Sequence, residues 1–150
     1  MIKAHWMAVC ALLVWLSSLS AYGADLAGMI KVANGQVSIE RDGKKLLGEV
    51  GSPVEVADRI RTGPDASVGV TLRDNTLLSA GPNSLIVIDK FAFNDTTQDG
   101  NMSIRIRKGT LSVASGRIAK RMPESVDFHT PTSVLGVRGT EFVIEVAGGS

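Results

Sequence analysis

Apolar and polar residues alternate in short segments along most of the chain, and this period-2 pattern decides what the chain can fold into. The pattern is clearest over residues 66–72, where every second residue is Ala, Val or Leu, and it returns over 37–40, 102–107 and 141–146. Such segments form strands with one face on a core and one in water. Residues 85–88 are four consecutive apolar β-formers, so that strand is expected to be covered on both faces. The chain is therefore predicted to be all-β.

Gly, Pro, Asp and Asn separate these segments and predict where the strands turn. Asp42-Gly43 predicts a hairpin turn with positive φ, and Asp74-Asn75 predicts another, because Asn tolerates the left-handed conformation. Lys108-Gly109 is expected to end the strand that starts at Met102. The only helix expected is one short turn within residues 115–122.

A weak internal repeat bears on the architecture. Residues 63–70 resemble residues 81–88, with their prolines about 18 residues apart, and residues 130–137 resemble both. Lys108-Gly109-Thr110 likewise parallels Arg138-Gly139-Thr140. Turns that open on Pro, close on Ser and launch an apolar strand would place successive strands at similar positions in a coil. We expect short stacked strands in an irregular, β-solenoid-like arrangement, with a small β-sandwich or barrel as the alternative.

Residues 1–23 have the layout of a cleavable signal peptide. A basic start precedes an apolar run over residues 6–16, and Ala21-Tyr22-Gly23 supplies small residues for cleavage before Ala24. The apolar run is shorter than the roughly 20 residues that span a bilayer, so an uncleaved anchor is the weaker alternative. We expect a single β domain over residues 24–150, periplasmic or secreted. Cleavage would remove the only Cys, so burial and not disulfides must hold this domain.

Charge and aromatic content weigh against several classes of partner. One of the 16 Lys and Arg lies in the signal segment, which leaves the mature domain balanced against its 15 acidic residues. A neutral domain is poorly suited to nucleic acid or anionic lipid. The four Phe are its only aromatic residues, too few for the stacking platforms of sugar-binding or single-strand-binding sites. We expect no nucleic-acid partner and no membrane insertion after signal cleavage.

Residues that could carry catalysis or hold a metal are scarce. The mature chain has no thiol and one histidine, His129, which strand parity turns away from Phe128 toward solvent. The polar stretch 94–101 is expected to be a surface loop. It has some features of a calcium loop, but Ile106 stands where the closing carboxylate should be. No catalytic, cofactor-binding or metal-binding residue is predicted, and no cofactor is expected.

Asp58 is the one acidic residue set within an apolar alternation, between Val56 and Ile60. In a straight strand its carboxylate would point inward. A turn at Ala57-Asp58 costs less than burying a charge, so we expect a turn and no buried carboxylate.

Several of these elements together resemble the FecR domain family. The segments that carry the resemblance are Gly35-Gln36-Val37, Arg41-Asp42-Gly43, Asp58 to Gly63, Val70 to Thr76, Gly81 to Ser84 and Thr130 to Thr140. The resemblance runs from about residue 29 to residue 146. Asn75 departs from the Gly that the family usually has after Asp, but Asn can hold the same backbone.

The resemblance implies an extracytoplasmic, solenoid-like β domain of a Gram-negative type bacterium, without catalytic residues. In iron-transport signalling such a domain meets the signalling domain of an outer-membrane receptor. The family positions are expected to serve the fold, and they are Asp58, Arg59, Thr62, Gly63, Asp74, Asn75, Gly81, Pro82, Ser84, Gly109, Thr130, Pro131, Arg138, Gly139 and Thr140. Arg138 beside Gly139 is the segment most easily interpreted as a binding site, although the parallel at Lys108-Gly109 favours a structural turn.

The function expected from these observations is a non-enzymatic interaction or sensing module that presents a sheet edge or loop to an unknown envelope protein. A component of iron-transport signalling through an outer-membrane receptor is the first alternative. A hydrolase is the second, because paired carboxylates could be assembled by the fold alone.

Overall fold

A computed structural model of the chain describes residues 25–137 and 139–147. The strands are β1 (Leu26–Asn34), β2 (Val37–Arg41), β3 (Lys44–Leu47), β4 (Pro53–Glu55), β5 (Arg59–Thr62), β6 (Ser67–Leu72), β7 (Leu77–Ala80), β8 (Leu85–Phe93), β9 (Gly100–Ala114), β10 (Val126–His129), β11 (Val134–Gly136) and β12 (Glu141–Val146). Two short helical segments, α1 (Arg117–Arg121) and the 3-10 helix η1 (Pro123–Ser125), lie between β9 and β10. The prediction of an all-β fold with short stacked strands is confirmed.

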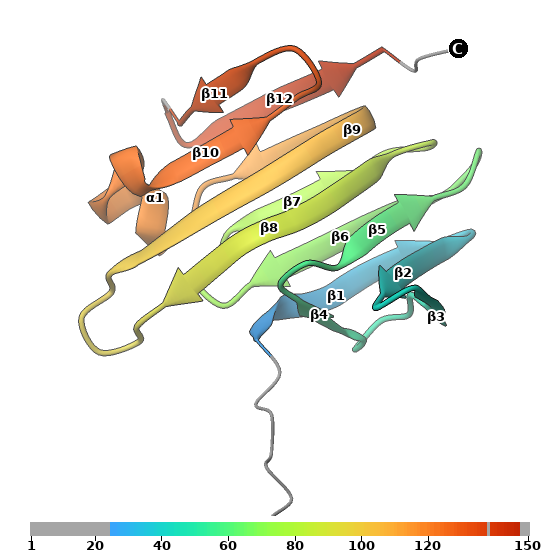
Figure 1. The fold of residues 1–150 in the computed structure, drawn as a ribbon, viewed down its shortest axis with the longest axis horizontal. Coiled ribbons are helices and arrows are strands. Elements are labelled where there is room, and N and C mark those ends of the chain that lie inside the picture. The colour runs from blue at the N-terminus through green and yellow to red at the C-terminus, as the bar shows by residue number, and fades with distance from the viewer. Residues whose placement is uncertain (1–24, 138, 148–150) are drawn as a thin grey trace, which may run out of the picture.

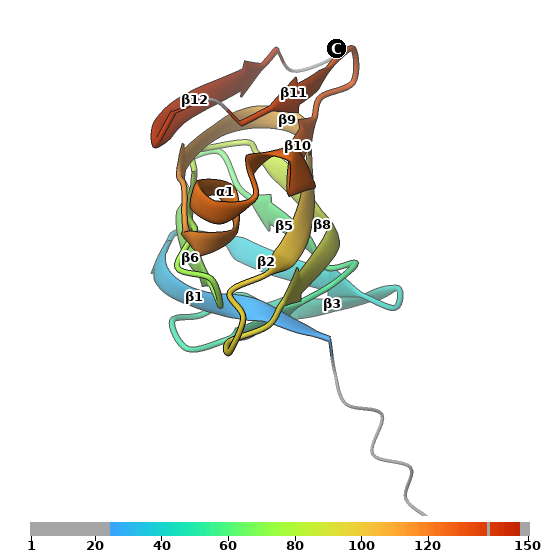
Figure 2. The ribbon, with the colours of Figure 1, turned by 90° about the vertical axis from the view of Figure 1, so that its left-hand side faces the viewer.

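The strands form a sheet that curls into an open half-barrel (Figures 1 and 2). Along its main path the neighbours are β3-β2-β5-β8-β9-β7-β6-β1-β4. The curl brings two layers face to face, with β6 and β8 on opposite sides of the core in Figure 2. Layer 1 contains β4, β1, β6, β7 and β12, and layer 2 contains β3, β2, β5, β8, β10 and β11. β9 belongs to both layers.

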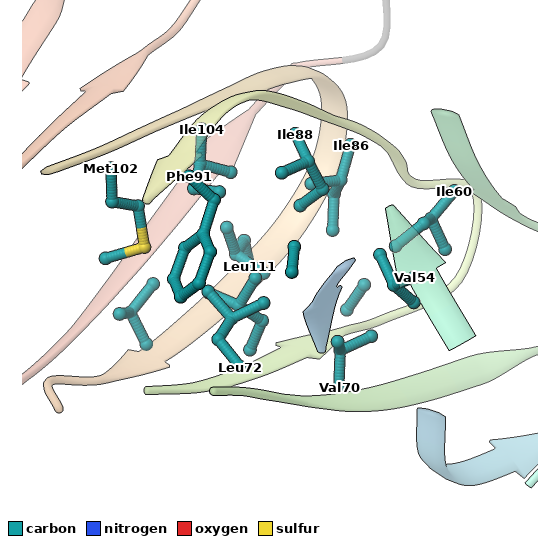
Figure 3. Packing of buried hydrophobic residues seen from close by; sticks show 14 of the residues in the cluster. Val54, Ile60, Val70, Leu72, Ile86, Ile88, Phe91, Met102, Ile104 and Leu111 are labelled. Carbon is teal, nitrogen blue, oxygen red and sulfur yellow. The ribbon is translucent and has the colours of Figure 1, made fainter. Parts of the chain in front are cut away.

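The hydrophobic core fills the inside of the curl. Figure 3 shows Ile60, Ile86 and Ile88 of layer 2 across the core from Val70 and Leu72 of layer 1. All five side chains are buried, and each stabilises the fold by about 1.5–3 kcal/mol relative to an exposed position. The predicted alternation over residues 66–72 and the predicted coverage of residues 85–88 on both faces are confirmed.

β9 is the longest strand, and it joins the two layers (Figure 1). Up to Lys108 it pairs with β8, and from Leu111 to Ala114 it pairs with β7. Gly109 lies between these parts with a φ of 92° inside the continuous strand. The prediction that Lys108-Gly109 ends the strand is wrong. A turn and a bend within a strand both use a glycine at positive φ, so the local sequence does not separate them.

The turns of the internal repeat form, but they do not build successive coils. The Pro-containing turns do precede β6, β8 and β11, as the repeat predicted. However, β6 and β8 lie in opposite layers, and among the described strands only β10 pairs with a parallel neighbour, β9. The curl of the sheet is consequently closer to the barrel alternative than to a regular coil.

The remaining predicted elements are found with small shifts in their boundaries. The polar loop spans residues 94–99, because Gly100 and Asn101 already belong to β9. The short helix α1 lies within the predicted stretch 115–122. No helix in the described part of the chain has the length and apolar character needed to cross a bilayer.

Candidate interaction surface

Residues from three distant family segments meet at one corner of the half-barrel. The Thr62 hydroxyl donates to the Gly81 carbonyl over 2.7 Å and accepts from the Ser84 amide over 2.8 Å. The Ser84 hydroxyl in turn accepts from the Thr110 amide over 3.1 Å. Thr62 and Ser84 are buried, so their polar groups are satisfied within the protein. These residues tie the end of β5 to the start of β8 and to the bend of β9.

Asp58 is buried, and its carboxylate is bound by Arg41. The Arg41 guanidinium donates to both carboxylate oxygens, with Nε to Oδ1 at 2.9 Å and Nη2 to Oδ2 at 2.7 Å. The Glu55 amide donates a third bond to Oδ2 over 2.8 Å. The hydrogen bond to Asp58 is the main reason that the pKa of Arg41 is raised above its ordinary value. A turn does form, with Ala57 at a φ of 74°.

The prediction that this turn keeps the Asp58 carboxylate out of the interior is wrong, since the residue is 1% exposed. Three charge-assisted hydrogen bonds offset the cost of removing the carboxylate from water. The partner that makes this possible, Arg41, comes from the preceding hairpin.

Asp74 is a second buried carboxylate, and it is held without an arginine. The Thr76 amide and hydroxyl donate to its two oxygens over 3.1 and 2.8 Å, and the Ile118 amide donates over 3.2 Å. The Gly116 amide donates to the Thr76 hydroxyl, which joins the start of α1 to the turn before β7. Asn75 has a φ of 69°, as predicted for this turn.

The C-terminal family segment is more exposed. The Thr130 hydroxyl accepts from the Ser133 amide over 3.0 Å in the turn before β11, and Pro131 is exposed. Gly139 has a positive φ, 94°, which fits the structural turn that the parallel with Lys108-Gly109 favours. Arg138, the family residue that could bind an anion, lies outside the described residues.

The two sequence-predicted regions closest to a catalytic or metal site, His129 and the polar loop, each make a simple ion pair in the described structure. The His129 Nε2 atom lies 2.9 Å from the Asp127 carboxylate, and its side chain is partly exposed, as predicted. Asp99 in the polar loop pairs with Arg121 over 2.9 Å. Among residues 25–137 and 139–147, no three His, Cys, Asp or Glu side chains gather as a metal site would require.

β3 is an edge strand at one end of the sheet, and its apolar side chains are exposed to solvent. It pairs only with β2 among the described strands, and all four of its residues are exposed. Leu46 is 37% exposed and Leu47 is 69% exposed. A groove of about 350 Å³ runs beside this strand, and the residues of its wall include Val37, Lys45, Leu46, Leu47, Thr62 and Gly63. The groove extends from β3 across β2 to Thr62 and Gly63, at the end of a family segment.

A second cleft, of about 510 Å³, lies between β11 and β12 at the other end of the fold. Leu135 and Val143 line it, and Val143 is 66% exposed. β12 pairs only with β9, and β11 only with β10, among the described strands.

Neither the β3 edge nor the arginines on the outer surface of layer 2 are among the residues predicted from the sequence to be functional. An edge strand has a hydrogen-bonded neighbour on one side only. The alternation of apolar and polar residues does not show how many neighbours a strand has. The arginines had a visible signal, because Arg59-Ile60-Arg61 and Arg105-Ile106-Arg107 each place two cations on the face opposite a buried isoleucine.

Comparisons with known proteins found one family and one solved structure. A family model described as FecR protein matches residues 58–150. A solved "Cell surface anchoring domain" is 24% identical to this chain, covers 40% of it and 80% of its own length, and superposes with a TM-score of 0.39. A search of curated proteins found no match.

Proposed function

Because the chain belongs to the FecR protein family, we propose that it is a non-enzymatic, periplasmic or secreted module that binds an envelope protein through the β3 edge. The family is a signalling and regulatory one linked to the cell surface, and its domain is extracytoplasmic. The observation that carries the proposal is the open edge of β3 beside an apolar groove.

The β3 edge supports binding by strand addition. A partner strand laid along β3 would gain backbone hydrogen bonds that β3 does not make within the described part of the chain, and the groove would take one of its apolar side chains. Lys44 and Lys45 on β3 are typical of edge strands that avoid pairing with copies of themselves. These two lysines still allow pairing with a partner strand that is not itself positively charged.

The burial of several family residues supports a structural role for these positions. Thr62, Ser84, Asp58 and Asp74 make their hydrogen bonds inside the fold. We therefore propose that these positions hold the half-barrel in shape and that the partner contacts the surface next to them.

Capture of envelope proteins by the immobilised mature domain tests the proposal. Leu47→Ser should abolish capture of a partner seated on β3. Val143→Ser is the matched control, because Val143 has nearly the same exposure on an edge strand at the far end of the fold. Equal loss in both variants, or loss only in Val143→Ser, would overturn the assignment to β3. An outer-membrane receptor among the captured proteins would place the module in iron-transport signalling.

Two further measurements test the enzyme and export parts of the proposal. Turnover of generic glycoside or ester substrates that is lost on mutating one Asp or Glu would establish a hydrolase instead.

Intact mass should show a mature protein that starts at Ala24. Both Trp and the only Tyr precede Ala24, so the mature protein should absorb very little at 280 nm.

A further inference from the structure

Four arginines lie together on the outer surface of layer 2, although the chain as a whole is nearly neutral. They are Arg59 and Arg61 on β5 and Arg105 and Arg107 on β9, and we name them the arginine quartet. All four are exposed, and a buried isoleucine separates the members of each pair. All four side chains therefore leave the sheet on the side away from the core.

β8 passes between the two pairs, and its register with β9 shifts beside Arg107. Val87 pairs with Arg59 on one side and with Arg105 on the other, and Leu85 pairs with Arg61. With strands about 4.8 Å apart and alternate residues about 7 Å apart along a strand, the quartet outlines a patch of about 7 by 10 Å. Val87 and Leu85 are each 8% exposed, as expected where long side chains lie over them.

The quartet is largely without acidic partners in the described part of the chain. Asp89 lies 3.1 Å from the Arg105 Nε atom. None of the other three arginines makes an ion pair there, including Arg59, whose cross-strand neighbour is Glu40. Like charges at this spacing repel each other, so a bound anion would lower the electrostatic energy of the patch.

The quartet is continuous with the groove beside β3. Arg61 and Lys45 line both that groove and a neighbouring hollow of about 250 Å³, which Arg59 and Glu40 also line. A chain that leaves the β3 edge and continues across the outer surface of β2 would reach these cations. Guanidinium groups suit such a chain if it carries carboxylates, because they bind them in a planar, bidentate manner.

Three features favour a polypeptide over a membrane surface. The outer face of a half-barrel is convex, so a flat bilayer would contact only part of it. Glu40 and Asp89 lie within the basic face, where a plane of lipid phosphates would be brought against them. The face also presents no aromatic side chain at its described positions on β5, β8 and β9 next to the quartet, and aromatic residues are the usual anchors at a lipid interface.

We propose that the arginine quartet binds an extended acidic segment of the protein partner. This proposal rests on the proposed function, since it names the chemistry of the partner expected at the β3 edge. The segment would place carboxylates over Arg61 and Arg107 and continue toward the apolar groove.

Binding of a fluorescent peptide of alternating Glu and Ser to the mature domain, measured by anisotropy, tests the proposal. Arg61→Gln/Arg107→Gln should weaken binding about tenfold, as expected for the loss of two partly exposed ion pairs. Arg117→Gln/Lys120→Gln, which removes the same charge from exposed positions on α1, should change it less than about twofold. Arg61→Lys/Arg107→Lys keeps the charge but loses the bidentate geometry, so it should weaken binding by an intermediate amount, and it tests the quartet even if the Gln pair fails to fold.

Other outcomes would overturn the proposal. These are no peptide binding, equal loss in the quartet and α1 variants, or quartet-dependent binding to phosphatidylglycerol vesicles without binding to the peptide. The result for the proposed function is separate. A domain that captures an envelope protein through Leu47 but ignores the peptide overturns only the acidic segment, whereas peptide binding without capture overturns only the proposed function.

Discussion

Gly109 and Gly139 show the same short motif in two different surroundings. Each follows a basic residue and precedes a Thr, and their φ angles are 92° and 94°. A Cβ atom on Gly109 would lie 2.5 Å from the Cα atom of Ser84, whereas a Cβ atom on Gly139 would meet no atom within 4 Å. The motif therefore specifies the backbone conformation, and the neighbouring segments decide how much depends on it.

The difference extends to the residues around each glycine. The Gly109 corner is buried, and Thr62 and Ser84 join three segments there. Around Gly139 the Ser115 hydroxyl donates to the Gly139 carbonyl over 3.5 Å, and the Ser115 amide donates to the Thr140 carbonyl over 2.7 Å. In the same family segment, the turn at Thr130 is exposed and closes on itself through Ser133. The buried corner should dominate stability, and the exposed turns should contribute little.

The largest effect is expected for Gly109→Val. The side chain combines a strained positive φ with a clash against the backbone at Ser84, so we expect a loss of about 3–5 kcal/mol in the free energy of unfolding. Urea unfolding of the variant and wild type measures it. If Gly109→Val lost no more unfolding free energy than Gly139→Val, the proposed difference between the two glycine positions would be wrong.

Thr62→Val should follow. The change keeps the volume of the side chain but leaves the Ser84 amide and the Gly81 carbonyl without this partner, at a cost of about 2–3 kcal/mol. A double-mutant cycle with Ser84→Ala should show coupling between the two sites. Additive effects would mean that the corner is not one hydrogen-bonded unit.

Gly139→Val should cost about 1–2 kcal/mol, because only backbone strain opposes the new side chain. Thermal unfolding beside Gly139→Ala checks this result. Both new side chains face open space, so the two variants should lose similar amounts of stability. The difference between them should be much smaller than either loss. A much larger loss for Val would show that Gly139 is packed.

Thr130→Ala should have the smallest effect, about 0.5–1 kcal/mol, since the hydrogen bonds of the Thr130 hydroxyl lie in an exposed turn where water can replace them. The same unfolding assay measures it, with Thr132→Ala as the control in the same turn. A loss as large as that of Thr62→Val would remove the distinction between the buried corner and the exposed turn.

Much of the fold could be predicted from the sequence because it rests on local patterns. Alternation over residues 66–72 identified the buried face of β6, and Asp42-Gly43 adopts the predicted turn with φ angles of 52° and 75°. Gly109 was misassigned because a strand that bends and a strand that ends share one local signature. The burial of the Asp58 carboxylate depends on Arg41, which belongs to another hairpin. The sequence around Asp58 does not indicate this partner.

Less of the candidate surface could be predicted, because it depends on which strands become neighbours. A balanced total charge argued against binding anionic surfaces, yet the fold gathers Arg59, Arg61, Arg105 and Arg107 on one face. Each pair is visible in its own strand, but only β8 pairing with both strands brings the pairs together. The β3 groove likewise forms where β2, β3 and the end of β5 meet.

The position of β9 in the sheet also determines when the domain can fold. β7 and β8 both complete their pairing with β9, and β10 and β12 are added onto it, so these four strands wait for residues 100–114. The pairing of β7 with β9 joins residues far apart in sequence, and such pairings close slowly, since loop entropy must be lost before the contacts form. Until residues 100–114 are available, one edge of β7 and one edge of β8 stay unpaired. Folding should therefore come late and in one cooperative step, with β9 as the strand on which both layers close.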